Sequence, residues 1–163
     1  MKINLAMDES QFIDGYKNHI ITPELLEQIP DATCTEILLI DSLDYIPTET
    51  LPVVIGKLRH GGTIQIVSTD LLEICRSIFL GLLPMEECNT HLTNGRLKLI
   101  PLIQIKQQLE SLGLQIVEMS MKNIKYDIKA QRPRICPRVL KYLLVVKIAI
   151  LLIMMAKHKQ DVD

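Results

Sequence analysis

Apolar residues occur along the chain in two patterns, short continuous runs and runs with helical spacing. The first pattern is typical of strands. Residues 36–41 form an apolar run that ends in an acid, as in a parallel strand buried on both faces. The short connection between the last two runs indicates a β-hairpin. The predicted strands are residues 2–7, 16–21, 36–41, 63–68, 114–120 and 124–130.

Segments with helical spacing lie between these strands. The clearest start is Thr22-Pro23-Glu24, which supplies an N-cap, a proline in the first turn and an acid at the positive end of the helix dipole. Strands that alternate with helices imply right-handed parallel crossovers, so the sequence predicts an α/β fold with a mixed sheet and helices on both faces. Residues 84–101 are predicted to be irregular. The predicted helices run from Pro23 to about Pro30, from Thr48 to about Gly61, and over residues 71–82, 102–112 and 138–157.

The composition is that of an ordinary globular protein. The chain has 163 residues, of which 48% are apolar and 23% charged, and its formal net charge is −1. This composition excludes a disordered, tail-like chain and offers no basic field for nucleic acid. With no tryptophan and 2 phenylalanines, the chain also has few platforms on which bases could stack. We therefore expect no nucleic-acid partner.

The cysteines indicate a reducing environment. The chain has 4 of them, without a Cys-x-x-Cys pair or histidines at metal-ligand spacing. The sequence therefore predicts no metal site and no disulfide framework. The N-terminus lacks the charged start and long apolar run of a secretory signal. Together these features predict a cytoplasmic protein.

The C-terminal segment differs from the rest of the chain. We divide the sequence into an α/β domain over residues 1–132 and a basic and apolar helix with its tail over residues 133–163. The uninterrupted apolar run at residues 148–156 is shorter than the roughly 20 residues that a membrane span needs. Flanking basic residues suit a helix lying on an anionic membrane surface, whereas burial against the sheet or between two copies explains the same apolar residues. For residues 138–157 both peripheral membrane contact and a homo-oligomer remain open.

Three segments, in order along the chain, carry a family resemblance. Residues 36–47 form a strand that ends in an acid and is followed by a second acid, an aromatic residue and a proline. Residues 58–71 carry a leucine, basic residues and a Gly-Gly pair before a strand and a further acid. Residues 3–8 and 15–20 read as a strand, a loop and a second strand. In this order they resemble the small class I S-adenosylmethionine-dependent methyltransferases often found with surface-polysaccharide genes, which implies a Rossmann-like fold over residues 2–130.

The resemblance implies a cofactor site at the ends of the first two strands, where this sequence departs from the family pattern. The family has a Gly-x-Gly turn that lets the backbone approach the cofactor, and an acid that accepts the ribose hydroxyls. Ala6 and Asp8 stand at the glycine positions, and Ile20 stands in place of the acid. These substitutions make the cofactor motif degenerate and are expected to weaken S-adenosylmethionine binding, because Asp8 also brings a like charge toward the methionine carboxylate. The cofactor-facing positions so implied are Leu5, Ala6, Asp8, Ile20 and Asp41.

Asp41 and Asp44 are the candidate catalytic residues. They lie at the carboxyl end of a central strand, where open α/β sheets bind their ligands. They could orient an acceptor or act as a general base, or they could simply cap the loop or solvate it. Asp70 has the same ambiguity, since N-capping the following helix explains it without any chemistry. Motifs of hydrolases and nucleoside triphosphatases are absent from the sequence.

Two functions remain open at this point. An active protein would transfer a methyl group from S-adenosylmethionine to an oxygen or nitrogen of a small-molecule or saccharide acceptor, with Asp41 or Asp44 assisting proton removal. The alternative is a catalytically inactive methyltransferase-fold protein that acts as a binding or scaffold protein through its C-terminal apolar helix.

Overall fold

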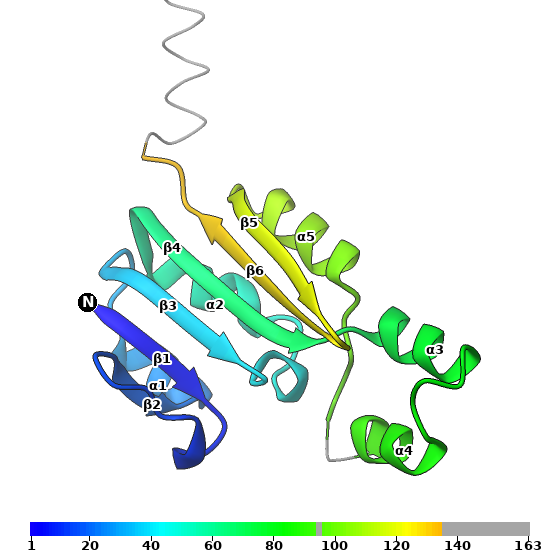
Figure 1. Cartoon of the computed structure of the whole chain (residues 1–163). Helices are drawn as coiled ribbons and strands as arrows, with labels where there is room; N and C mark the ends of the chain where they lie inside the picture. Colours follow the sequence, from blue (N-terminus) through cyan, green and yellow to red (C-terminus); the bar gives the residue numbers. More distant parts are fainter. Residues whose placement is uncertain (94–95, 135–163) are drawn as a thin grey trace, which may run out of the picture.

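A six-stranded sheet forms the centre of the computed structural model, which describes residues 1–93 and 96–134 (Figure 1). The strand order is β2-β1-β3-β4-β6-β5. The first four strands in this order are parallel, and β6 and β5 join them antiparallel. The predicted parallel sheet with a C-terminal antiparallel hairpin is therefore confirmed. The strands are β1 (Lys2–Ala6), β2 (Lys17–Ile20), β3 (Cys34–Ile40), β4 (Leu58–Thr69), β5 (Gln115–Lys122) and β6 (Lys125–Gln131).

The helices begin largely where the sequence places their caps. The Thr22 hydroxyl accepts a hydrogen bond from the Leu25 backbone N–H, as an N-cap does. A helix forms within residues 84–101, which were predicted to be irregular, so that expectation is wrong. The predicted helix over residues 138–157 lies outside the described residues. The helices are α1 (Pro23–Gln28), α2 (Thr50–Lys57), α3 (Leu71–Phe79), α4 (Met85–Thr93) and α5 (Leu102–Ser111), with short 3-10 helices η1 (Glu9–Gln11) and η2 (Leu43–Tyr45).

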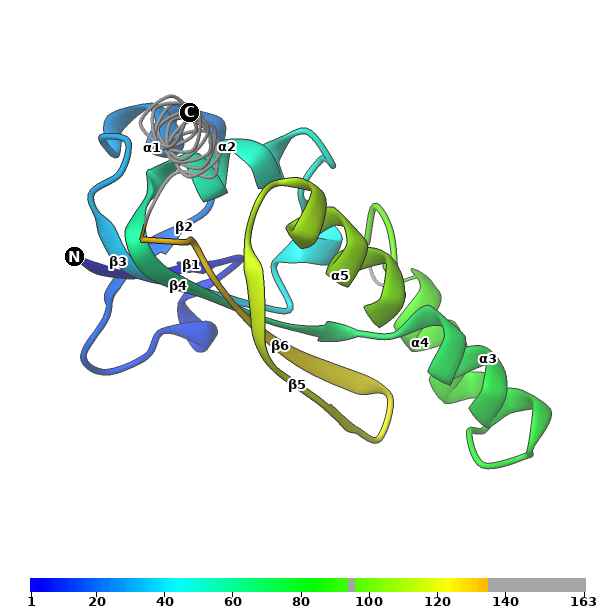
Figure 2. The ribbon, with the colours of Figure 1, turned by 90° about the horizontal axis from the view of Figure 1, so that it is seen from above.

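Helices cover one face of the sheet only, within the part of the chain that the structure describes. Figures 1 and 2 show α1, α2 and α5 on the same side of the strands, with α3 and α4 beyond the carboxyl end of β4. The expected helices on both faces are therefore not found. The reason is the connection between β1 and β2, which is short and forms only η1, so no crossover helix reaches the second face.

Side-chain burial alternates along the strands in agreement with this one-sided cover. In β4, Ile64 and Ile66 are fully buried toward the helices, while Gln65 between them is partly exposed. In β6, Tyr126 and Ile128 are buried, and the residues between and beside them are partly exposed. Alternation with period two is what a half-covered sheet requires. The apolar core consequently lies between the sheet and the layer formed by α1, α2 and α5.

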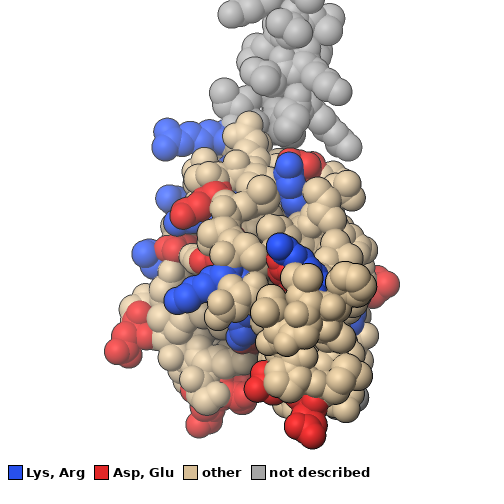
Figure 3. Space-filling view, turned by 45° about the vertical axis from the view of Figure 1, so that its right-hand side comes forward, with Lys and Arg blue, Asp and Glu red and all other residues tan. Residues whose placement is uncertain are grey.

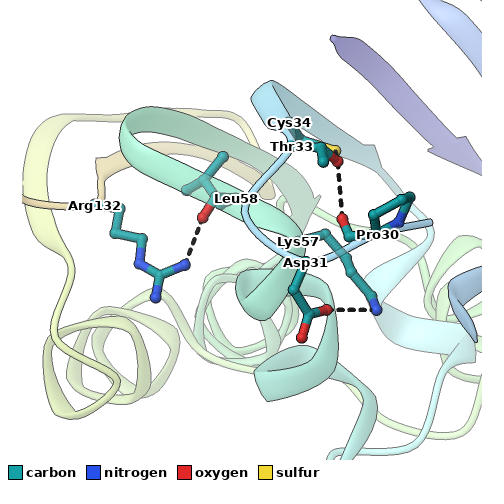
Figure 4. A network of polar contacts seen from close by, with 7 residues as sticks. All are labelled: Pro30, Asp31, Thr33, Cys34, Lys57, Leu58 and Arg132. Atoms are coloured by element: carbon teal, nitrogen blue, oxygen red, sulfur yellow. Dashed lines mark hydrogen bonds and ion pairs between the residues drawn. The ribbon is translucent and has the colours of Figure 1, made fainter.

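The Gly61-Gly62 pair lies at the start of the long strand β4. Gly61 has a φ of +78°, and a Cβ on Gly62 would come within 3.0 Å of the backbone oxygens of Arg59 and Cys34. Both positions therefore require glycine for a local reason. The same end of β4 is fixed by the Arg132 guanidinium, which donates to the Leu58 carbonyl (Figure 4).

The surface of the described chain carries both signs of charge. Lys/Arg and Asp/Glu side chains are scattered over the face drawn in Figure 3, with stretches between them that carry neither. None of the described helices is long and apolar enough to cross a membrane.

Glu36 of β3 links the uncovered face of the sheet to the segment before β2. Its carboxylate accepts a hydrogen bond of 2.7 Å from the Tyr16 hydroxyl and forms an ion pair of 2.9 Å with Lys2. The Lys2 contact, followed by the Tyr16 bond, lowers the pKa of Glu36. Burial and the bond to Glu36 raise the pKa of Tyr16 to about 12. The two groups therefore stabilise each other while Glu36 is ionised and Tyr16 is neutral.

This arrangement predicts an acid-labile contribution to stability. A carboxyl whose pKa is lower in the folded state contributes at neutral pH and loses that contribution as the pH falls through its folded pKa. We expect the free energy of unfolding of the wild type to fall more steeply on acidification than that of Glu36→Gln, by about 1 kcal/mol, because Lys2 is well exposed. Urea unfolding of both proteins between neutral and acidic pH measures this, and parallel pH profiles would contradict it.

Candidate functional site

A groove of about 400 Å³ runs between α1 and α2. One wall is formed by Met7 and Ile21, which directly follow β1 and β2, and by Tyr45, the last residue of η2 in the loop after β3. Most of its lining is apolar. Pockets at the carboxyl ends of parallel strands are where open α/β sheets bind ligands, and this volume is within the range of small-molecule sites. The groove is therefore the candidate binding site.

Two carboxylates and one ammonium group border this groove. Glu27 comes from α1, Glu49 immediately precedes α2, and both are exposed. Lys57, at the end of α2, lines the groove and forms an ion pair of 2.7 Å with Asp31 (Figure 4). The Lys57 ammonium group is already paired with Asp31. The side chains of Glu27 and Glu49 are therefore the carboxylates of the groove that can accept hydrogen bonds from a ligand.

The loop after β1 folds on itself. Ala6 is fully buried, and the Met7 backbone N–H donates to the Gln11 side chain at 2.7 Å. The Asp8 carboxylate caps η1 by accepting from the Ser10 backbone N–H at 2.8 Å and from the Ser10 hydroxyl. Asp8 has an extended backbone, with φ of −149°, so it does not adopt the conformation for which glycine is needed. The Met7 N–H and the Asp8 carboxylate are therefore already engaged within the loop.

Asn4 and Asn18 fix this loop to the sheet. The Asn4 amide donates to the Gln11 carbonyl at 2.8 Å and to the Asn18 side-chain oxygen at 2.9 Å. Asn18 in turn accepts from the Ile13 backbone N–H at 2.9 Å. These bonds explain how a connection without a crossover helix keeps a defined shape, because they tie the loop to β1 and β2.

Asp41 is placed at the carboxyl end of β3 in a left-handed conformation, with φ of 53°. Its carboxylate forms an ion pair of 2.6 Å with Lys125 at the start of β6. The second carboxylate oxygen has no hydrogen-bond partner. The Asp41 side chain is 21% exposed as a whole, whereas this unpartnered oxygen is buried. Positive φ is uncommon outside glycine and persists where surrounding contacts hold it, here the bond from the Asp41 N–H to the Val67 carbonyl.

Asp44 is fully buried beside β4. One carboxylate oxygen accepts a 2.6 Å hydrogen bond from the Ser68 hydroxyl, and the other lies 3.6 Å from the Arg96 guanidinium. The Asp44 carbonyl accepts from the Leu97 backbone N–H, which ties the segment before α5 to the end of β3. Burial raises the pKa of Asp44, and the Ser68 bond and Arg96 oppose this rise. Asp44 therefore contributes to the site indirectly, by joining the loop after β3 to β4 and to the segment before α5.

Asp70 has a structural role that accounts for both of its carboxylate oxygens. One accepts from the Leu72 and Glu73 backbone N–H groups at the start of α3, and the other accepts from the Leu102 N–H at the start of α5 at 2.7 Å. One side chain thus caps two helices. This settles the alternative left open by the sequence in favour of capping.

The predicted cofactor residues are not brought together around the groove. Leu5 and Ala6 are fully buried, Asp8 caps its own loop, and Ile20 is 45% exposed. None of the five predicted positions lines the groove, whereas the residues that follow β1 and β2 do. The sequence reasoning missed Glu27 and Glu49, and no sequence pattern distinguished them from ordinary surface acids of a helix.

No protein-family model and no curated protein matches this chain. Solved structures do match it. It is similar to a methyltransferase from Archaeoglobus fulgidus, with a TM-score of 0.54 and 15% identity over 79% of this chain and 75% of that one. The CMeT domain of the citrinin polyketide synthase has a TM-score of 0.54 and 14% identity over 82% of this chain. The protein has the fold of the S-adenosylmethionine-dependent methyltransferases.

A third structure with this methyltransferase fold shows how much of each protein is shared. A methyltransferase from Thermotoga maritima matches with a TM-score of 0.50 and 14% identity, over 72% of this chain and 65% of that one. The chain spans only 40% of the citrinin synthase structure. At these identities the shared property is the fold, and the chemistry has to be argued from the site.

The groove fits part of the cofactor that the methyltransferase fold implies. An apolar cavity of this size suits the adenine ring, and carboxylates at its border suit ribose hydroxyls, which donate hydrogen bonds. At residues 6–8 the Met7 backbone N–H already donates to the Gln11 side chain, and residue 8 is an aspartate. The residues present therefore fit the adenosine portion of S-adenosylmethionine.

Proposed function

We propose that this protein is an S-adenosylmethionine-dependent methyltransferase that binds the adenosine portion of its cofactor in the groove between α1 and α2. The observation that carries the proposal is the position of this groove, one wall of which follows the carboxyl ends of β1 and β2 and includes the loop after β3 in a methyltransferase fold. In such sheets the carboxyl edge is the ligand-binding edge.

In this proposal Glu27 and Glu49 take the place of the missing ribose acid. Both carboxylates line the groove, whereas Ile20, at the position expected for the acid, lies outside it. Ile21 and Ile46 provide apolar contact for the base. The bound cofactor supplies an electrophilic methyl group, and the work of the chain is to hold and orient the reactants and exclude water.

Asp41 is the proposed general base. It is partly exposed and forms an ion pair with Lys125 at 2.6 Å, and a carboxylate is a group that accepts a proton from an acceptor hydroxyl or amine. Asp44 is fully buried and is instead a positioning residue that holds the loop between β3 and α2. An acceptor of the small-molecule or saccharide class is part of the proposal and rests on the family resemblance of residues 36–47 and 58–71.

An inactive binding or scaffold protein is the alternative function that we propose to test against methyl transfer. Because the Met7 N–H and the Asp8 carboxylate are engaged within the loop after β1, the protein could retain a nucleoside-binding groove without methyl transfer and act as a binding or scaffold protein. In that case the protein would act through residues 138–157, for which the sequence leaves membrane contact and a homo-oligomer open.

Calorimetric titration tests the proposal. We expect S-adenosylhomocysteine and S-adenosylmethionine to bind with micromolar dissociation constants. Glu27→Gln and Glu49→Gln should each weaken binding about tenfold, which corresponds to the loss of one charge-assisted hydrogen bond. Glu24→Gln is the matched control, because Glu24 is exposed on α1 but does not line the groove. Its affinity should equal that of the wild type.

The outcomes separate the two functions. Absence of binding at millimolar ligand would overturn the proposed methyltransferase. Adenosine that binds as tightly as S-adenosylhomocysteine would show that the methionine end is not held, and would favour the second function. Release of S-adenosylhomocysteine from S-adenosylmethionine in the presence of a saccharide acceptor, lost in Asp41→Asn, would support methyl transfer with Asp41 as the base.

A further inference from the structure

The outer edge of β5 is free in the described part of the chain. β5 is the last strand of the sheet and pairs on one side with β6 only. All residues from Val117 to Lys122 are exposed. An edge strand presents unpaired backbone N–H and C=O groups, which are a template for pairing with another strand.

The register of the hairpin determines which backbone groups point outward. The turn between β5 and β6 contains two residues, so Lys122 and Lys125 at its ends form a hydrogen-bonded pair. Pairs alternate along an antiparallel ladder, and Met121 with Tyr126 and Met119 with Ile128 are therefore not hydrogen-bonded to each other. The N–H and C=O groups of Met119 and Met121 consequently point away from β6.

An exposed apolar patch borders the same strand. Met119 and Met121 lie opposite the buried Ile128 and Tyr126, hence on the face covered by the helices. Together with Leu72 of α3 and Ile103 of α5 they line a shallow cavity of about 390 Å³. Their exposed fractions are 43%, 41%, 58% and 54% for Met119, Met121, Leu72 and Ile103. Apolar side chains gathered at an unpaired strand mark an interaction surface.

We propose that two copies of this chain pair through β5, antiparallel, about a two-fold axis at Ser120. In that register Met119 of one copy faces Met121 of the other, and the two residues form a pair with two backbone hydrogen bonds. The two-fold axis repeats this pair on its other side. Glu118 then faces Lys122 of the second copy, and symmetry repeats this ion pair on the other side of the axis. The apolar patches of the two copies lie next to the axis on one face of the joined sheet.

The charge pattern selects this register over its neighbours. Moving the axis to Met119 places Glu118 opposite Ser120 of the second copy, and moving it to Met121 places Lys122 opposite Ser120. Neither shift makes an ion pair between Glu118 and Lys122. The irregular register between Ile116 and Glu118 ends regular pairing on one side. The interface is therefore short, and a micromolar dissociation constant is expected.

A charge-exchange experiment tests the proposal on the full chain. The dissociation constant is measured by sedimentation equilibrium with a reductant present, because Cys75 is exposed. The wild type should form dimers. E118K and K122E each place like charges opposite each other twice and should weaken the dimer at least about tenfold. The double variant E118K/K122E restores opposite charges and should return to within about threefold of the wild type.

The experiment has defined negative outcomes. A wild type that is monomeric at about 1 mM overturns the proposal. Dimers whose dissociation constant is the same in the wild type, E118K and K122E show that another surface, such as residues 138–157, holds the copies together, and also overturn it. Far-ultraviolet circular dichroism of each variant verifies that the hairpin is folded, which is expected because both side chains are exposed.

Discussion

Replacing Asp44 by alanine is expected to lower the free energy of unfolding by about 3 kcal/mol. The substitution leaves two buried partners without their acceptor, the Ser68 hydroxyl at 2.6 Å and the Arg96 guanidinium at 3.6 Å. Removal of one member of a buried ion pair is strongly destabilising because the other charge remains uncompensated. Urea unfolding at neutral pH, followed by circular dichroism, measures the change.

Two further variants show which contact carries the effect. Asp44→Asn keeps an acceptor for Ser68 and should lose less stability than Asp44→Ala, since only Arg96 then lacks its partner. Asp14→Ala removes an exposed acid and should change stability by less than about 0.5 kcal/mol. Equal stability of Asp44→Ala and the wild type would mean that Arg96 finds another partner and that Asp44 does not hold the loop.

The pH dependence of this contribution has the opposite sign from that of Glu36. Burial raises the pKa of Asp44, so the neutral acid is favoured more in the folded than in the unfolded state. Protonation of Asp44 therefore adds stability that is complete below its unfolded pKa and is lost as the pH rises through its folded pKa, while the contacts to Ser68 and Arg96 persist at neutral pH. The acid limb of the stability curve therefore combines a loss from Glu36 with a gain from Asp44, and the single variants separate the two.

Replacing Val53 by tryptophan is expected to weaken binding of S-adenosylhomocysteine about a hundredfold or more. Val53 lies on α2, lines the groove and is 47% exposed. The larger ring would occupy the space proposed for adenine, at a position where the fold does not depend on the side chain. Calorimetric titration measures the dissociation constant. A hundredfold increase corresponds to a loss of about 2.7 kcal/mol of binding free energy.

The matched control is Phe79→Trp, because Phe79 is 88% exposed on α3 and does not line the groove. It should bind the ligand like the wild type and unfold at the same urea concentration. If Val53→Trp retained full affinity while remaining folded, the ligand would bind elsewhere and the groove would lose its assigned role. Unchanged binding in the control excludes a general effect of added aromatic surface.

The sequence predicted correctly those elements that are determined by a few neighbouring residues. The Thr22 cap, the strand at residues 36–41 and the hairpin around Asn123 all form as expected, because capping, continuous apolar runs and tight turns are short-range effects. α4 was missed because it is largely polar, and its buried side chain Cys88 is too isolated to give a periodic signal.

The face of the sheet that carries no helices was not predicted, although the strands contain a hint of it. In β4, Thr63 and Gln65 alternate with Ile64 and Ile66, which is typical of a sheet covered on one side, whereas residues 37–40 of β3 are continuously apolar. The site was less predictable still. Asp41 and Asp44 are three residues apart in sequence, and only the tertiary contacts of Ser68, Arg96 and Lys125 make one buried and leave the other partly exposed.

The edge strand β2 gives the sheet a region of low local stability. β2 contains four residues, none of them buried, and it joins the sheet through β1 alone. It can therefore detach together with the loop after β1 while β3, β4 and β6 stay paired, since few apolar contacts are lost. Met7 lies in this loop after β1 and also borders the groove. A ligand in the groove would thus be bound most tightly by the closed form, and its arrival would suppress amide exchange in β2 without any change in the central strands.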